Sequence, residues 1–156
     1  PRNARIMAAV IRDQLIQAQP EHTDAFRNNH ARFLDALNAT DDHVRKELRE
    51  LPLGTAFLVF HPAWAYFAEE YGLRQISIEY EGKEPKPARL QEIITEAREL
   101  GIRTVWADEQ RSSRLAETIA EALGGEVLMT NPLDVDWHQN LRTIAETLRR
   151  ANQRES

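Results

Sequence analysis

The sequence predicts an α/β protein in which a four-stranded parallel sheet is flanked by helices and preceded by two N-terminal helices. Two observations support this prediction. From residue 55 onward, four short apolar segments alternate with amphipathic ones, the pattern of βαβ units that join parallel strands by right-handed crossovers. Residues 1–51 instead show only the three-to-four-residue spacing of helical faces. The chain therefore joins a helical segment to an α/β domain.

The helical segment begins with a helix predicted at residues 2–18. Its apolar side chains lie on one stripe: Ile6, Met7, Val10, Ile11 and Leu15. Pro20 ends this helix and opens a second one at about 20–39. The inward side chains of the second helix are Phe26, Phe33, Leu34 and Leu37. The triplet Thr40-Asp41-Asp42 predicts a new cap and a helical continuation up to the turn at Leu51-Pro52-Leu53-Gly54.

The strands and helices of the α/β domain follow from short apolar runs and the residues that bound them. The strands are predicted at 55–60, 75–79, 103–107 and 126–130. The helices are predicted at 62–71, 87–100, 111–123 and 136–151. Pro62 and Pro87 suit the first turn of a helix, and Gly101, Gly124 and Gly125 occupy positions typical of helix C-caps.

Composition limits the classes of function. The 156 residues carry a net charge of −5, whereas non-specific nucleic-acid binding needs a basic face, so we expect no nucleic-acid partner. There is no cysteine to form a thiolate zinc site or a disulfide. The sequence also lacks the Gly-x-Ser-x-Gly elbow and the glycine-rich phosphate loops of common enzyme classes. We therefore expect a protein that is not an enzyme.

The sequence pattern indicates His61 as the candidate functional residue. It follows the apolar run Ala56–Phe60 and precedes an aromatic helical face: Trp64, Phe67 and Tyr71. An imidazole at the carboxyl end of a core strand lies where open α/β sheets bind ligands, and it can bind a metal or transfer a proton. Three hypotheses follow: a metal-binding protein, a small hydrolase-like enzyme that pairs His61 with Asp108 or Glu109, and a non-catalytic α/β interaction module.

Residues 60–73 resemble a metal-site segment of the solute-binding proteins of zinc and manganese ABC transporters, the cluster A-I family. In that family the segment runs Phe-His-x-Ala-Trp/Tyr-x-Tyr-Phe and continues to Tyr-Gly-Leu. The matching residues are His61, Ala63, Trp64, Tyr66, Phe67, Tyr71, Gly72 and Leu73. The resemblance extends through five further segments: Phe26 to Phe33, Glu84 to Pro87, Val105 to Gln110, Ser113 to Ala120, and Asn131 to Leu141. Within the third of these, Asp108 stands where the family usually has Glu.

The resemblance implies that His61 is a metal ligand in the intact protein and that the metal, Zn²⁺ or Mn²⁺, is the transported solute. Zinc is favoured, because manganese-type members often have Glu at this position. Asn131 stands where some members have a carboxylate ligand; its amide oxygen is a weaker ligand, and a turn residue is the alternative. Asp134 or Asp136 is expected to cap the last helix, with His138 on the helix surface.

The resemblance also implies a division of the chain. Residues 1–18 would be a helix left over from an N-terminal lobe that is absent, residues 20–51 the linking helix, and residues 52–156 the C-terminal α/β lobe. The absent lobe would supply two further histidine ligands. We therefore expect this fragment to bind little or no zinc by itself, and to form a homodimer through the apolar stripe of its first helix.

Family membership would also set the partner and the location of the intact protein. It would deliver its metal to an ABC permease, and it would lie in the periplasm or be anchored to the outer side of a membrane, as in the lipoproteins of cell-adhesion type that the family includes. No signal sequence precedes Pro1 in this chain.

Overall fold

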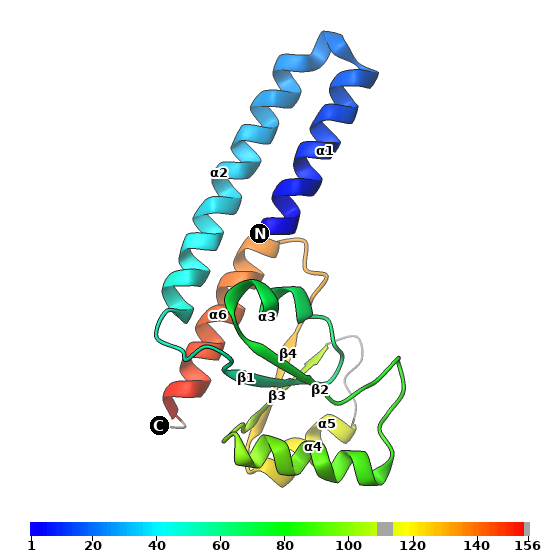
Figure 1. The fold of residues 1–156 in the computed structure, drawn as a ribbon, viewed down its shortest axis with the longest axis vertical. Coiled ribbons are helices and arrows are strands. Elements are labelled where there is room, and N and C mark those ends of the chain that lie inside the picture. The colour runs from blue at the N-terminus through cyan, green and yellow to red at the C-terminus, as the bar shows by residue number, and fades with distance from the viewer. Residues whose placement is uncertain (109–113, 155–156) are drawn as a thin grey trace. The chain divides into compact units, whose positions relative to one another are not determined.

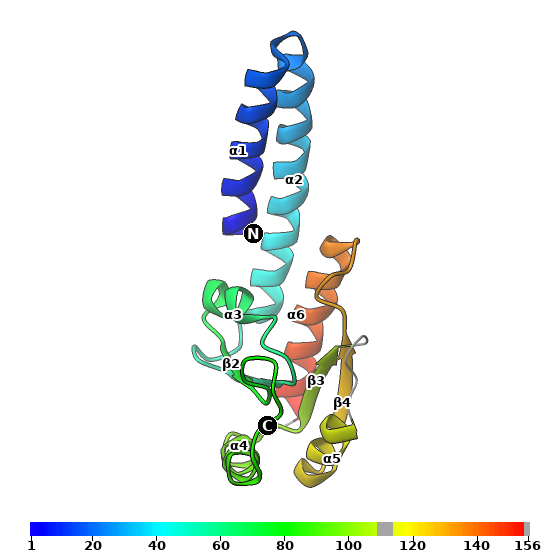
Figure 2. The same cartoon turned by 90° about the vertical axis from the view of Figure 1, so that its right-hand side faces the viewer.

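The computed structural model describes residues 1–108 and 114–154, and it divides into two units, residues 1–46 and 47–156. The first unit is a helical hairpin. Helix α1 (Arg2–Ala18) is followed by the 3₁₀ turn η1 (Pro20–His22) and by α2 (Thr23–Leu48), which runs back alongside α1 (Figures 1 and 2). The helix predicted at residues 2–18 is thereby confirmed.

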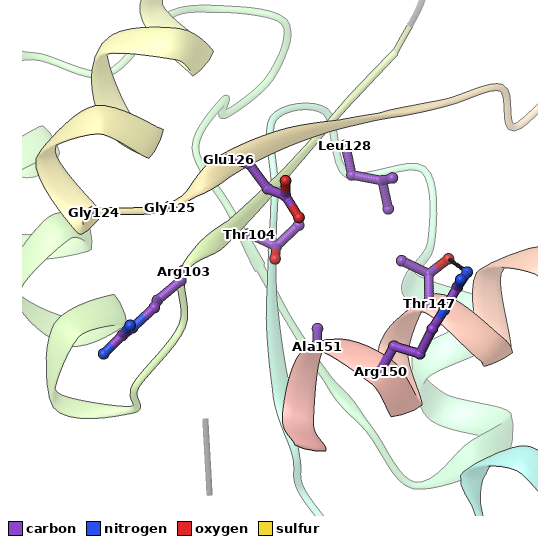
Figure 3. Close-up of a pocket in the computed structure, with 9 residues that line it drawn as sticks. All are labelled: Arg103, Thr104, Gly124, Gly125, Glu126, Leu128, Thr147, Arg150 and Ala151. Atoms are coloured by element: carbon purple, nitrogen blue, oxygen red, sulfur yellow. Dashed lines mark hydrogen bonds between the residues drawn. The ribbon is translucent and has the colours of Figure 1, made fainter. Parts of the chain in front are cut away.

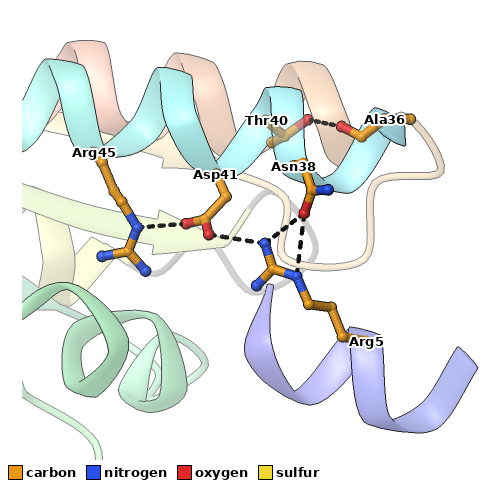
Figure 4. Close-up of polar contacts among 6 residues, drawn as sticks. All are labelled: Arg5, Ala36, Asn38, Thr40, Asp41 and Arg45. Atoms are coloured by element: carbon orange, nitrogen blue, oxygen red, sulfur yellow. Dashed lines mark hydrogen bonds and ion pairs between the residues drawn. The ribbon is translucent and has the colours of Figure 1, made fainter. Parts of the chain in front are cut away.

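Helix α2 is continuous over 26 residues, so the cap predicted at Thr40-Asp41-Asp42 is wrong. The Thr40 hydroxyl donates to the carbonyl oxygen of the residue four positions earlier, 3.0 Å away, a bond that forms within an unbroken helix. The buried Asp41 carboxylate accepts hydrogen bonds from Arg5 of α1 at 3.0 Å and from Arg45 at 3.1 Å (Figure 4). Arg5 also donates to Asn38 at 2.8 Å. The polar triplet therefore stays helical, because its side chains find partners without a break.

The second unit is built on a four-stranded parallel sheet in the order β2-β1-β3-β4. Its strands are β1 (Ala56–Val59), β2 (Arg74–Ser77), β3 (Thr104–Asp108) and β4 (Glu126–Thr130). Strand β1 pairs with β2 on one side and with β3 on the other, so that Val59 lies opposite both Ser77 and Trp106. The chain thus changes direction across the sheet between β1 and β3, which is the switch point where open α/β sheets bind ligands.

Helices cover both faces of the sheet (Figures 1 and 2). Helices α3 (Ala65–Tyr71) and α6 (Trp137–Arg154) lie on one face, and α4 (Pro87–Glu99) and α5 (Arg114–Leu123) on the other. The main apolar core joins strand side chains to those of α4 and α5, with Leu58, Val105 and Ile119 fully buried. The face of the sheet that α3 covers carries aromatic side chains. The ring centroids of Phe57 and Trp106 lie 5.2 Å apart there.

The predicted fold class is confirmed, and most predicted elements differ from the structure only at their ends. The predicted start of one helix is wrong, because α3 begins at Ala65 and not at Pro62. A turn precedes it, in which the Ala63 amide donates to the His61 carbonyl oxygen at 2.8 Å. Pro87 does occupy the first turn of α4, as predicted. Gly125, which was predicted as a helix C-cap, is required for a different reason. A Cβ at this position would lie only 1.6 Å from the Arg103 carbonyl oxygen.

Candidate metal centre

His61 lies at the carboxyl end of the central part of the sheet. The Phe60 amide donates to the Trp106 carbonyl oxygen at 2.7 Å, which carries the β1–β3 pairing one residue beyond Val59. His61 follows directly and is half-buried. The backbone leaves the sheet here, at the switch point between β1 and β3. The structure therefore places the imidazole at the strand end that the sequence predicts.

The backbone after His61 is held by buried neighbours. The Trp64 amide donates to the side-chain oxygen of Gln75 on β2 at 2.8 Å. The Trp64 ring is buried and meets Trp106 and Phe67 edge to face, with centroid distances of 6.3 Å and 6.2 Å. These contacts fix the turn between β1 and α3 from two sides, so the position of the histidine backbone is determined by the core of the domain.

The imidazole itself is held by Glu79. Its Nδ1 lies 2.6 Å from Glu79 Oε2, and the side chains of His61 and Glu79 are 32% and 9% exposed. Glu79 is brought there by the sheet, because its amide donates to the Phe60 carbonyl oxygen at 2.9 Å just past the end of β2. With Nδ1 engaged by a carboxylate, Nε2 is the nitrogen that remains to bind a metal.

Glu79 was not among the sequence-predicted site residues. The available signal was its position at the end of the strand predicted at 75–79, next to the strand predicted at 55–60. Carboxyl ends of neighbouring parallel strands meet at one edge of a sheet, but the pairing of two residues across that edge depends on the register, which the sequence does not state.

Asn131 follows β4 at the same edge of the sheet and forms a turn. Its Oδ1 accepts a hydrogen bond from the Leu133 amide at 3.0 Å, and its carbonyl oxygen accepts one from the Asn140 side chain at 2.7 Å. The oxygen that would bind a metal thus supports an Asx-type turn, the alternative weighed for this residue. A role for Asn131 as a ligand stays a prediction.

The side chains of the acidic residues near Asn131 accept hydrogen bonds from nearby backbone amides. Asp136 Oδ1 accepts from the Gln139 amide at 3.1 Å, directly before α6 begins at Trp137, so the predicted acidic cap is confirmed. Asp134 Oδ1 accepts from the Asp136 amide at 2.9 Å. His138 is half-buried, with its ring centroid 3.4 Å from that of Trp137.

In residues 1–108 and 114–154, no group of three or more histidine, cysteine, aspartate or glutamate side chains is arranged to hold a metal ion. The enzyme hypothesis paired His61 with Asp108 or Glu109; the carboxylate that bonds its Nδ1 is that of Glu79, and Glu109 lies outside the described residues. The same stretches contain no helix with the length and apolar character needed to cross a bilayer.

A pocket of about 500 Å³ lies at the opposite, amino-terminal ends of β3 and β4 (Figure 3). Thr104 and Glu126 begin the two strands, and Thr147 and Arg150 of α6 face them across the pocket. None of the predicted site residues lines it. Because parallel sheets place their ligand sites at the carboxyl ends of strands, this pocket is separate from the candidate metal centre.

Comparison with known proteins identifies zinc-uptake and zinc-binding proteins as relatives. The chain is 28% identical to the high-affinity zinc uptake system protein ZnuA of Brucella abortus over 159 aligned residues, which cover 96% of this chain and 47% of that protein. It is 30% identical to the zinc-binding protein AdcA of Streptococcus pyogenes, over 89% of this chain and 29% of AdcA. The chain thus spans half or less of the length of these relatives.

Comparison with solved structures also identifies ZnuA. A crystal structure of ZnuA superimposes with a TM-score of 0.90 at 36% identity, covering 96% of this chain and 58% of that one. The laminin-binding protein Lmb of Streptococcus agalactiae, described as an adhesin with metal-transporting activity, gives a TM-score of 0.78 at 25% identity over 90% of this chain and 58% of Lmb. The family model for the zinc-uptake complex component A, periplasmic, matches residues 1–151. This chain therefore belongs to the ZnuA family of zinc-uptake components.

Proposed function

We propose that this chain is part of a solute-binding protein that captures Zn²⁺ for an ABC transporter, and that His61 Nε2 supplies one ligand to the ion. The observation that carries the proposal is the half-buried imidazole at the β1–β3 switch point, with Nδ1 bonded to a carboxylate and Nε2 left for a metal. Family membership supports zinc as the solute. A histidine ligand also binds Mn²⁺, but less tightly.

His61 alone does not make a zinc site, because protein zinc sites use at least three protein ligands. Asn131 offers at most a neutral oxygen. We therefore propose that the remaining ligands come from another part of the full-length protein, which corresponds to the region of the relatives that this chain does not span. The proposed division is the one implied by the resemblance: residues 1–18 belong with that other part, 20–51 form the linking helix, and 52–156 form one lobe.

The wider setting is proposed on the same basis. The partners are the metal ion and an ABC permease, and the protein acts in the periplasm or anchored to the outer side of a membrane; the description of the family model as periplasmic supports the first location. Binding and release need no bond-making in the solute, so we propose no enzymatic activity. The net charge of −5 disfavours a nucleic-acid partner.

The proposal is tested by zinc affinity in the full-length protein. His61→Ala should weaken binding by at least tenfold, since it removes a direct ligand, in competition with a zinc-sensitive dye. His138→Ala is the matched control, because it removes a half-buried imidazole from α6 in the same domain. Equal losses from both substitutions would refute the assignment of His61.

The chain by itself should bind Zn²⁺ weakly or not at all, because it offers one strong ligand. Calorimetric titration of the chain measures this directly. Sub-micromolar one-to-one binding that disappears in His61→Ala would show that a complete site forms within these residues, and it would overturn the proposal that other ligands are needed.

A further inference from the structure

We propose that Glu79 is a positioning residue for His61: it holds the imidazole in the Nδ1–H tautomer and in one orientation, so that Nε2 is the nitrogen that meets the metal. This inference rests on the proposed function, because it concerns the same site. It assigns a role to a side chain that lies 18 residues from His61 in the sequence and contacts its imidazole.

The contact between the two side chains has the geometry of a strong hydrogen bond. The distance of 2.6 Å from Nδ1 to Oε2 is short for a bond between nitrogen and oxygen. A carboxylate only accepts, so the proton between them is carried on Nδ1. In a neutral ring the other nitrogen, Nε2, then has its lone pair available for a metal.

The carboxylate is a fixed partner because its backbone is fixed on both sides. Before it, the buried Ile78 donates its amide to the Val59 carbonyl oxygen at 2.9 Å. After it, Tyr80 and Lys83 exchange backbone hydrogen bonds of 3.1 Å and 3.0 Å. The two residues between them, Glu81 and Gly82, have φ of 50° and 74°, the conformation of a tight two-residue turn. Glu79 is therefore held between a paired strand extension and a closed turn.

A fixed carboxylate next to a ligand histidine favours binding, because it removes the entropic cost of orienting the ring when the metal arrives. Glu79 is itself 9% exposed, whereas His61 is 32% exposed, so the carboxylate stands behind the imidazole and the imidazole faces solvent. This order is the one expected of an outer partner and its metal ligand.

The tautomer is measured on the metal-free chain by long-range ¹⁵N–¹H NMR of the histidine rings at alkaline pH, where free histidine is neutral. We expect His61 in the Nδ1–H form and a shift toward Nε2–H in Glu79→Ala. Glu69→Ala, an exposed substitution on α3, is the control and should leave the signals unchanged. A wild-type ring in the Nε2–H form overturns the proposal, even if no variant folds.

Affinity in the full-length protein gives the second readout. Glu79→Ala and Glu79→Gln should weaken zinc binding by about 10- to 100-fold, the range known for outer partners of metal ligands. In a His61→Ala background, Glu79→Ala should have no further effect, because it acts through the ring. An equal loss in that background overturns the proposal, as does unchanged affinity of folded Glu79 variants.

The two proposals fail differently. If His61→Ala leaves zinc affinity unchanged, the proposed function fails. If His61→Ala weakens binding and the Glu79 variants do not, only the positioning role fails. Circular dichroism of each variant identifies those that fold.

Discussion

His61 is held by two independent sets of neighbours. The backbone that follows it is anchored by the bond between Trp64 and Gln75, and its ring is anchored by Glu79. The two anchors lie in or just beyond β2, the strand next to β1. A change in β2 can therefore displace His61 without touching it.

Gln75→Leu should destabilise the α/β unit, because it removes the acceptor of the Trp64 amide and leaves a buried donor unsatisfied. We expect a loss of about 1–3 kcal/mol in the free energy of unfolding. The tryptophans all lie in this unit, so their fluorescence during urea unfolding reports on it. Gln91→Leu, at an exposed position of α4, is the control and should change stability by no more than about 0.5 kcal/mol. Similar losses from both would contradict this account of the turn.

For single residues, the sequence predicts those roles that depend only on neighbouring positions in the chain. The acidic cap of α6 and the strand-end position of His61 follow from short patterns. Glu79 does not, because its role depends on which strand lies beside β1 and in which register. The turn at Asn131 was one of two alternatives, and only the hydrogen bonds of the structure show how its side chain is used.

Among the elements, α2 shows how tertiary contacts override a local signal. Thr40-Asp41-Asp42 has the composition of a cap, yet the helix continues through it because Arg5 and Arg45 satisfy the buried carboxylate of Asp41. Strands β1 and β3 were easier to predict, because each is a short and largely apolar run that is mostly buried. Helix starts were less certain, as α3 shows.

Asp41→Ala should loosen the helical hairpin, because it removes the carboxylate that joins α1 to α2 through Arg5. Both arginines are partly exposed, so we expect a modest loss of about 1–2 kcal/mol. Circular dichroism at 222 nm during thermal unfolding measures the helical signal. Asp42→Ala changes an exposed carboxylate one position along α2 and serves as the control. If the control lowers stability as much, the buried contact is not the cause.

On the scale of the whole molecule, the α1 stripe is an exposed apolar surface. Its five residues are 41–59% exposed in the structure: Ile6, Met7, Val10, Ile11 and Leu15. Apolar stripes of this extent mark interaction surfaces. The homodimer expected through this stripe stays a prediction, since only its exposure supports it.

Light scattering behind a sizing column tests the homodimer. The chain should elute as a dimer at high protein concentration, and Ile6→Asp combined with Val10→Asp should convert it to the monomer, because charges in a paired apolar face are costly to bury. The sheet should stay folded, as judged by tryptophan fluorescence. A single species of 18.0 kDa at all concentrations would exclude self-association through α1.

The central position of β1 bears on how an ion would leave the proposed site. Leu58 and Val59 are paired on both sides and fully buried, so their amides open to solvent only when the domain as a whole opens. If His61 binds the ion as proposed, fraying of the strand that carries it is expected to be too rare to set the lifetime of the bound ion. Under the proposed function, release of zinc would instead have to change what surrounds His61, while the strand behind it keeps its structure.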